Sequence, residues 1–119
     1  EILVVHGYPA TQSALARVVE RDGVPVAERF ELYLGPLELA NGYHELTDAR
    51  EQRARFERDV AVRHARSDIA PPVDEALLAA LASGMPACSG VAMGVDRLLM
   101  AMLDTSRIAD VVAFDFARG

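Results

Sequence analysis

The sequence is poor in cysteine and has no long apolar run. Cys88 is the only cysteine among 119 residues, which excludes an internal disulfide framework and a cysteine-rich metal cluster. We interpret Cys88 as a small buried thiol in a reducing cytoplasm. No apolar run reaches the roughly 18 residues that a membrane helix requires, and no signal peptide stands at the start. We therefore expect a cytoplasmic protein without a membrane partner.

An excess of positive charge is also missing. Twelve basic and eighteen acidic residues give a formal net charge of −6, which excludes a global positive field that would hold a nucleic-acid backbone. Hydrophobic residues make up 51% of the chain and charged residues 25%, a balance typical of one soluble globular domain. The chain is small for a catalytic fold and begins at Glu1, so we interpret residues 1–119 as a piece of a larger domain.

Turn signals and apolar alternation predict strands in the first half of the chain. The expected strands are Ile2–Val5, ended by Gly7 and Pro9, and a hairpin of Val26–Leu34 and Leu37–Leu46 around Gly35 and Pro36. Between them, the helical spacing of Leu15, Val18 and Val19 predicts a helix over Thr11–Asp22.

Helix caps organise the second half. Asp48, with Glu51 three residues later, predicts a charged surface helix that runs to Arg66 and has a Glu51–Arg55 ion pair. Asp74 predicts the start of a helix that ends at Gly84 and Pro86. A strand over Cys88–Val95, a helix over Asp96–Leu103 and a final strand over Val111–Phe116 are expected to follow.

Small residues alternate in the segment from Gly90 to Gly94. Strand periodicity puts Gly90, Ala92 and Gly94 on one nearly bare face, which would let a ligand approach the backbone closely. Arg97 would lie in the first turn of the next helix, where a guanidinium suits phosphate oxygens. By spacing alone, the small residues would equally admit a neighbouring helix.

A second group of polar residues is Glu38, Asn41 and Glu45. Two carboxylates and a carboxamide on a half-apolar strand are costly to bury unless a cation, such as an ammonium group or a hydrated divalent ion, compensates them. An edge strand that exposes its charges to water is the alternative. Asn41 and Glu45 share strand parity and Glu38 does not, so a common site requires a bulge or twist between Leu39 and Asn41.

These segments together resemble a known enzyme family. Glu28-Arg29-Phe30-Glu31-Leu32-Tyr33 and Glu38-Leu39-Ala40-Asn41-Gly42-Tyr43-His44-Glu45-Leu46-Thr47-Asp48 are similar to the stretch before motif 3 of class II lysyl-tRNA synthetases, and Gly90 to Met100 is similar to motif 3, within residues 88–103. When Met85-Pro86-Ala87-Cys88-Ser89-Gly90 is included, the sequence is still more similar to the elongation factor P lysine ligases, which are truncated paralogues of those synthetases. The implied fold is α+β: part of an antiparallel class II synthetase sheet flanked by helices.

The resemblance also implies an activity. Lysine or (R)-β-lysine would be activated with ATP and Mg²⁺ as an aminoacyl adenylate and then transferred to a lysine of elongation factor P. By matching position, Asn41 and Glu45 would hold the substrate amines, and Glu38, as the metal ligand, would sit with the Leu39 backbone at ATP and magnesium. Gly94 would line the nucleotide site, Arg97 would hold the phosphates, and Ala92 would face the amino acid.

Two departures from the synthetase pattern affect this interpretation. Ala92 stands where lysyl-tRNA synthetases usually have glycine, which favours the ligases. Motifs 1 and 2 are absent, so half of the family's site is missing and we expect residues 1–119 alone to be inactive. The resemblance implies that the full-length protein forms a homodimer. The family resemblance also implies that Ser13–Val19 is extended. This contradicts the predicted helix, and we prefer the extended interpretation.

Two alternatives to the ligase remain open at this point. The acceptor would be lysine tRNA if the chain were the core of a lysyl-tRNA synthetase. A synthetase-like module without catalysis would instead serve binding or regulation. The histidines His6, His44 and His64 lack metal-ligand spacing, so no zinc site is expected.

Overall fold

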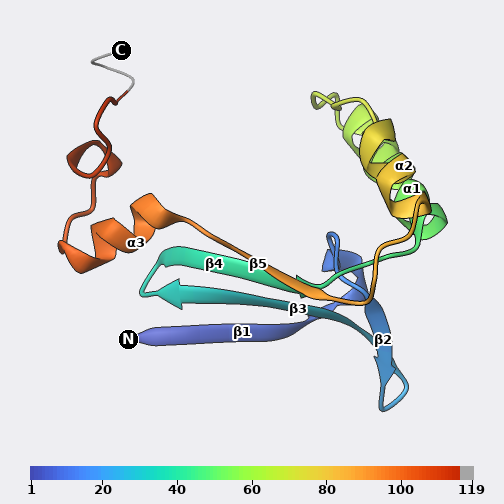
Figure 1. The fold of residues 1–119 in the computed structure, drawn as a ribbon, viewed down its shortest axis with the longest axis horizontal. Coiled ribbons are helices and arrows are strands. Elements are labelled where there is room, and N and C mark those ends of the chain that lie inside the picture. Colours follow the sequence, from blue (N-terminus) through green and yellow to red (C-terminus); the bar gives the residue numbers. More distant parts are fainter. Residues whose placement is uncertain (116–119) are drawn as a thin grey trace. The chain divides into compact units, whose positions relative to one another are not determined.

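The computed structural model describes residues 1–115 and divides into two compact units (Figure 1). The first unit consists of Glu1–His44 together with the chain from Ser89 onward, and the second consists of Glu45–Cys88. A five-stranded antiparallel sheet lies in the first unit, with one α-helix after its last strand. The second unit holds two α-helices. The expected α+β class with an antiparallel sheet is confirmed.

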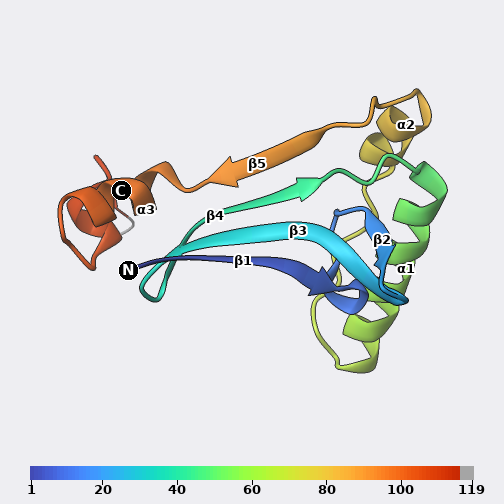
Figure 2. The same cartoon turned by 90° about the horizontal axis from the view of Figure 1, so that it is seen from below.

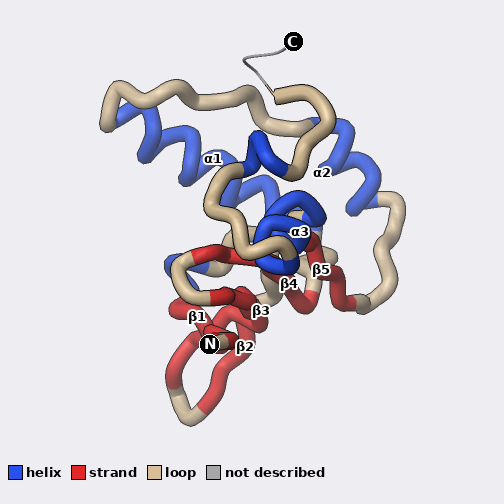
Figure 3. Tube along the Cα trace, turned by 90° about the vertical axis from the view of Figure 1, so that its left-hand side faces the viewer, coloured by secondary structure: helices blue, strands red, loops and turns tan. Residues whose placement is uncertain are grey.

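The sheet is ordered β1-β3-β4-β5, and β2 pairs with β3 beyond the end of β4, on the edge of β3 opposite β1 (Figure 2). Seen along the strands, β1, β3, β4 and β5 lie side by side (Figure 3). The strands are β1 Ile2–Pro9, β2 Val18–Arg21, β3 Val24–Leu34, β4 Leu37–His44 and β5 Ser89–Met93. The predicted hairpin of β3 and β4 around Gly35 is confirmed. Gly35 has a φ of +56°, a backbone conformation that glycine adopts more easily than other residues.

The helix predicted over Thr11–Asp22 is wrong. A single 3₁₀ turn, Ala10–Gln12, is followed by β2, in which Val18 and Val19 pair with Ala27 and Val26. Three apolar residues at helical spacing are a weak signal, and β-branched valines pack well once a neighbouring strand is present. The extended segment that the family resemblance favoured begins only at Val18 as a regular strand.

The first strand is longer than expected because it passes through an irregularity instead of ending at Gly7. His6 pairs with Phe30, but Tyr8 pairs with Ala27, so β3 has two residues, Glu28 and Arg29, opposite Gly7. Gly7 has φ +71°. The bulge lets β1 continue to Pro9 and changes the direction of Tyr8.

Side-chain caps start both helices of the second unit, as predicted. α1 spans Ala49–Ala65, and the Asp48 carboxylate accepts the backbone N–H groups of Arg50 and Glu51 at 2.8 and 2.9 Å. α2 spans Glu75–Ala82, and Asp74 accepts the N–H of Leu77 at 2.9 Å. The expected Glu51–Arg55 pair is present, with a shortest N–O separation of 2.5 Å.

The C-terminal part follows the prediction as far as the helix. α3 spans Val95–Met102, and a 3₁₀ turn, Ile108–Asp110, comes after it. The final strand predicted over Val111–Phe116 is wrong for residues 111–115, which form turns and bends, and Phe116 lies outside the described residues. None of the strands in the described sheet pairs with residues 111–115, so this apolar segment has no neighbour with which to form a strand.

The close contact of Phe30 with Gly42 gives a test of the sheet register. A Cβ on Gly42 would lie 2.4 Å from Phe30 Cε1 and 2.8 Å from the Gly90 carbonyl oxygen. We expect Gly42→Ala to lower the free energy of unfolding by about 1–3 kcal/mol, because overpacking forces neighbours to move. Urea unfolding followed by circular dichroism measures this change. Adding Phe30→Leu should recover part of the loss, and an unchanged midpoint for Gly42→Ala would contradict the register.

Candidate active-site face

Strand pairing gathers polar side chains on one face of the sheet. Along β3, alternation directs Phe30 and Leu32 to one face of the sheet and the residues on either side of each to the other face. Across the β3–β4 and β4–β5 ladders, the paired residues of this face are Arg29 with Tyr43 and Gly90, Glu31 with Asn41 and Ala92, and Tyr33 with Glu38. We call these residues the polar face. The bare positions Gly90 and Ala92 thus lie next to a carboxamide and an aromatic ring, as a ligand site would require.

A bulge at Leu39 brings Glu38 onto this face. Leu32 pairs with Ala40 but the next residue, Tyr33, pairs with Glu38, so Leu39 is an extra residue in β4. In a regular strand, residues three positions apart point to opposite faces, so the bulge is what places Glu38 and Asn41 on the same face. The irregularity that the sequence analysis required for a common site is therefore present, and Leu39 itself is buried.

Glu31 is the buried carboxylate of the polar face. Its side chain is 9% exposed and is held by three groups: the Arg29 guanidinium through Nη2, and the hydroxyls of Tyr33 and Tyr8. The hydrogen bonds from Tyr33 and Tyr8, with the charge of Arg29, keep the pKa of Glu31 below its ordinary value despite burial. Glu31 is therefore ionised at neutral pH.

Burial and the neighbouring Glu31 carboxylate raise the pKa of Tyr8. The hydrogen bond to Glu31 also raises the pKa of Tyr33. Both phenols consequently remain protonated donors. The sequence analysis did not select Glu31, although its alternation with Arg29 and Tyr33 was a usable signal of a polar strand face.

Arg97 and Glu38 are brought together at the end of β5. Arg97 Nη1 donates to the Glu38 carbonyl oxygen at 2.9 Å and lies 4.0 Å from the Glu38 carboxylate. The Gly94 N–H, at the N-cap of α3, donates to the Leu39 carbonyl oxygen at 2.9 Å. Half of the Arg97 side chain is exposed, so its outer donors face solvent and can meet an anion.

Six of the seven sequence-predicted site residues are therefore on neighbouring elements of the first unit. Asn41, Ala92, Glu38 and Leu39 are on paired strands, and Gly94 and Arg97 begin the helix that follows. Glu45 is the first residue of the second unit, where its N–H donates to the Cys88 carbonyl oxygen at 3.0 Å. The arrangement of the polar face includes Asn41 but not Glu45.

Other predicted features can be placed as well. Cys88 is a free thiol that is only half-buried, so the interpretation of Cys88 as a buried thiol is wrong. His44 Nδ1 lies 3.3 Å from Glu28, which also receives hydrogen bonds from Arg17 and Arg21. Among residues 1–115, no group of three or more histidine, cysteine or acidic side chains is placed to hold a metal ion.

Magnesium was expected at Glu38, and the donor chemistry allows it. Mg²⁺ prefers oxygen ligands, keeps several waters and is commonly bound through one or two carboxylates plus substrate phosphates. Glu38 offers a half-exposed carboxylate on the same face as the ionised Glu31. This set fits an ion that arrives with ATP rather than an ion held by protein ligands alone.

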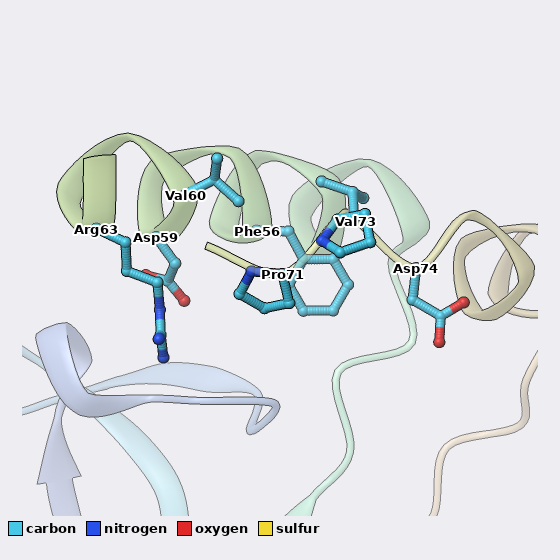
Figure 4. Close-up of a pocket in the computed structure, with 8 residues that line it drawn as sticks. Phe56, Asp59, Val60, Arg63, Pro71, Val73 and Asp74 are labelled. Carbon is cyan, nitrogen blue, oxygen red and sulfur yellow. The ribbon is translucent and has the colours of Figure 1, made fainter. Parts of the chain in front are cut away.

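A separate hollow lies within the second unit, between α1 and the loop before α2 (Figure 4). Phe56 and Val60 line it from the helix, and Pro71 and Val73 line it from the loop. Its volume is about 200 Å³. It contains none of the sequence-predicted site residues, so the candidate chemistry belongs to the polar face.

Comparison with known proteins places the chain in a family. The profile of tRNA synthetases class II (D, K and N) matches residues 1–118, and the chain therefore belongs to that family. Relatives named elongation factor P–(R)-beta-lysine ligase are 54% identical over 114 residues in Pectobacterium atrosepticum and 56% identical in Sodalis glossinidius. Each alignment covers 96% of this chain and 35% of the relative, so the chain spans about a third of their length.

None of the helices described in residues 1–115 is both long enough and apolar enough to cross a membrane.

The ionised Glu31 predicts a specific loss of stability in acid. Because its folded-state pKa lies below the ordinary value of 4.5, its contribution to stability is fully present above that pH and disappears as the pH falls through the folded-state pKa. We expect the free energy of unfolding of Glu31→Gln to change less between about pH 5 and about pH 3 than that of the original protein. Urea unfolding at stepped pH measures both slopes. Glu20→Gln, which changes an exposed carboxylate of β2, is the control, and equal slopes for Glu31→Gln and the original protein would refute the assignment.

Proposed function

We propose that this chain is part of an ATP-dependent ligase that activates (R)-β-lysine, or lysine, and attaches it to a lysine of elongation factor P. The observation that carries the proposal is the row Glu31, Asn41 and Ala92, which places negative charge and a carboxamide beside a bare strand position. The relatives named as such ligases, 54–56% identical, support the choice of substrate and acceptor.

The amino-acid end of the site is assigned to β4 and its continuation. Asn41 offers a carboxamide oxygen on the polar face, and Glu45 offers a carboxylate four residues further along. Each suits an ammonium group, and a charge-assisted hydrogen bond is about twice as strong as a neutral one. The assignment of Glu45 depends on the family pattern, whereas Asn41 is also supported by its pairing with Ala92.

The nucleotide end is assigned to the junction of β5 and α3. Arg97 would neutralise phosphate oxygens, Gly94 would let the nucleotide approach the backbone, and Glu38 would hold magnesium beside the Leu39 backbone. The Gly94–Leu39 and Arg97–Glu38 hydrogen bonds support this grouping because they fix the four residues as one corner. Bound magnesium would supply charge neutralisation at the phosphates.

The reaction that these residues would serve has two steps. A carboxylate oxygen of the amino acid attacks the α-phosphorus of ATP, an acyl–phosphate bond forms, and pyrophosphate leaves. The neutral side-chain amine of the acceptor lysine then attacks the acyl carbon, an amide forms, AMP leaves, and the amine gives up a proton. Positioning and charge neutralisation are the main protein contributions to such chemistry.

The remaining features of the proposal are those that the family resemblance implies. The active form would be a longer protein, a homodimer in the cytoplasm, and this chain alone would not activate amino acids. A tRNA acceptor is the second candidate, favoured only by the description of the family as tRNA synthetases. Pyrophosphate exchange followed by transfer assays on elongation factor P and on lysine tRNA distinguishes the two, and the absence of exchange would indicate a binding module.

Two substitutions in the full-length enzyme should separate the two ends of the site. We expect Glu45→Gln to raise the KM for the amino acid by roughly 10-fold or more, because a hydrogen bond to a charged group is worth about 1.5–3 kcal/mol. Arg97→Ala should instead mainly raise the KM for ATP. Steady-state pyrophosphate exchange with each substrate varied in turn measures both. Equal effects of the two changes on both substrates would contradict these roles.

Ala92 should influence the choice between lysine isomers. Its methyl group lies on the polar face opposite Asn41, where it would shorten the pocket near the amine-bearing carbon of the amino acid. One methyl group is worth about 1–3 kcal/mol of discrimination. We expect Ala92→Gly to raise activation of lysine relative to (R)-β-lysine by about 10- to 200-fold. Adenylate formation with each isomer tests this, and an unchanged ratio would remove Ala92 as the selectivity residue.

A further inference from the structure

Arg29 occupies the centre of the polar face without a role in the reaction described above. Its side chain is only 17% exposed. Burying a guanidinium is costly unless its charge and donors are satisfied, so a half-apolar sheet does not acquire such a residue without a reason. The surrounding contacts indicate what that reason is.

The guanidinium joins four separate parts of the first unit. Nη2 pairs with Glu31 on the same strand, and Nη1 donates to the Gln12 carbonyl oxygen at 2.9 Å. The guanidinium carbon lies 4.4 Å from the centre of the Tyr8 ring and 6.0 Å from that of Tyr43. The stacked Tyr8 also donates its hydroxyl to Glu31, so charge and ring contacts converge on one carboxylate.

Gly7 makes this convergence possible. Simple alternation from His6, which pairs with Phe30 on the apolar side, would point Tyr8 away from the polar face. The bulge at Gly7, with its positive φ, turns Tyr8 back toward Arg29. A backbone feature of β1 therefore serves the arrangement around Arg29.

The Arg29 guanidinium is directed at the protein through its two terminal nitrogens. Both terminal nitrogens have protein acceptors, and Nε is buried without a hydrogen-bond partner among residues 1–115. A buried unsatisfied donor reduces stability, so the protein keeps this arrangement at a cost. Arg29 consequently fits a residue that orients other groups better than one that binds substrate.

We propose that Arg29 is a positioning residue that acts through Glu31, fixing its carboxylate beside Asn41 in the orientation that amino-acid activation requires. The inference rests on the proposed function. A planar fork that is charged at every accessible pH can hold a carboxylate and two rings at once, which the flexible ammonium of lysine cannot do. Small errors in placing such groups affect the rate of the chemical step more than binding.

A double-substitution cycle in the full-length enzyme tests the inference. We expect Arg29→Gln to lower kcat for pyrophosphate exchange by about 100-fold, with smaller changes in KM for ATP and the amino acid. If Arg29 acts through Glu31, Glu31→Gln and the double variant should have nearly the same kcat as each other, because coupled residues are not additive. Arg29→Lys, which keeps the charge and is less disruptive, should also lose most of the activity.

The controls separate the possible outcomes. Arg21→Gln removes an arginine that contacts Glu28 on β3, and it should leave kcat unchanged. Additive losses in the cycle would overturn the inference, as would full activity of a folded Arg29→Gln, or of Arg29→Lys if the glutamine variant unfolds. If the unsubstituted enzyme shows no exchange with either lysine isomer, the proposed function fails and the inference fails with it. Normal exchange with additive losses contradicts the inference alone.

Discussion

The need to keep one buried carboxylate ionised determines much of the first unit. Glu31 loses most of its hydration in the middle strand, and its charge is stable there only because a guanidinium and two phenol hydroxyls replace the water. These partners come from β1 and β3, so the carboxylate requires both the pairing of these strands and the bulge that turns Tyr8 inward. The same requirement places a fixed negative charge next to Asn41. Stability and the candidate chemistry therefore depend on the same contacts.

Features with local causes were predictable from the sequence. The caps at Asp48 and Asp74 satisfy backbone donors within three residues, and the β3–β4 hairpin follows from the Gly35–Pro36 turn between two alternating runs. The bare face of Gly90 and Ala92 also follows from alternation within a single strand. In each case the signal and the structure that it produces lie in the same short segment.

Features that depend on a distant partner were not predictable in this way. The valines of β2 form a strand only because Val26 and Ala27 lie beside them, and β1 reaches Pro9 only because β3 accommodates an extra residue opposite Gly7. Glu31 was visible in the alternation of β3, but its importance depends on Tyr8, more than twenty residues earlier in the chain. Of the site, the sequence indicated the residues that we propose to carry the chemistry and missed Glu31 and Arg29, which we propose to hold the site in place.

The extra residue at Leu39 has a consequence for how this protein can change over time. The alternation of side chains between the two faces is shifted by one position on either side of it. Replacing Leu39 by another apolar residue keeps that shift, and losing the residue would remove it: Glu38 and Asn41 would then be two positions apart and would still share a face in a regular strand. A related protein with a gap at this position could therefore keep the polar face, but it would lack the buried Leu39 side chain and the carbonyl oxygen that accepts the Gly94 N–H.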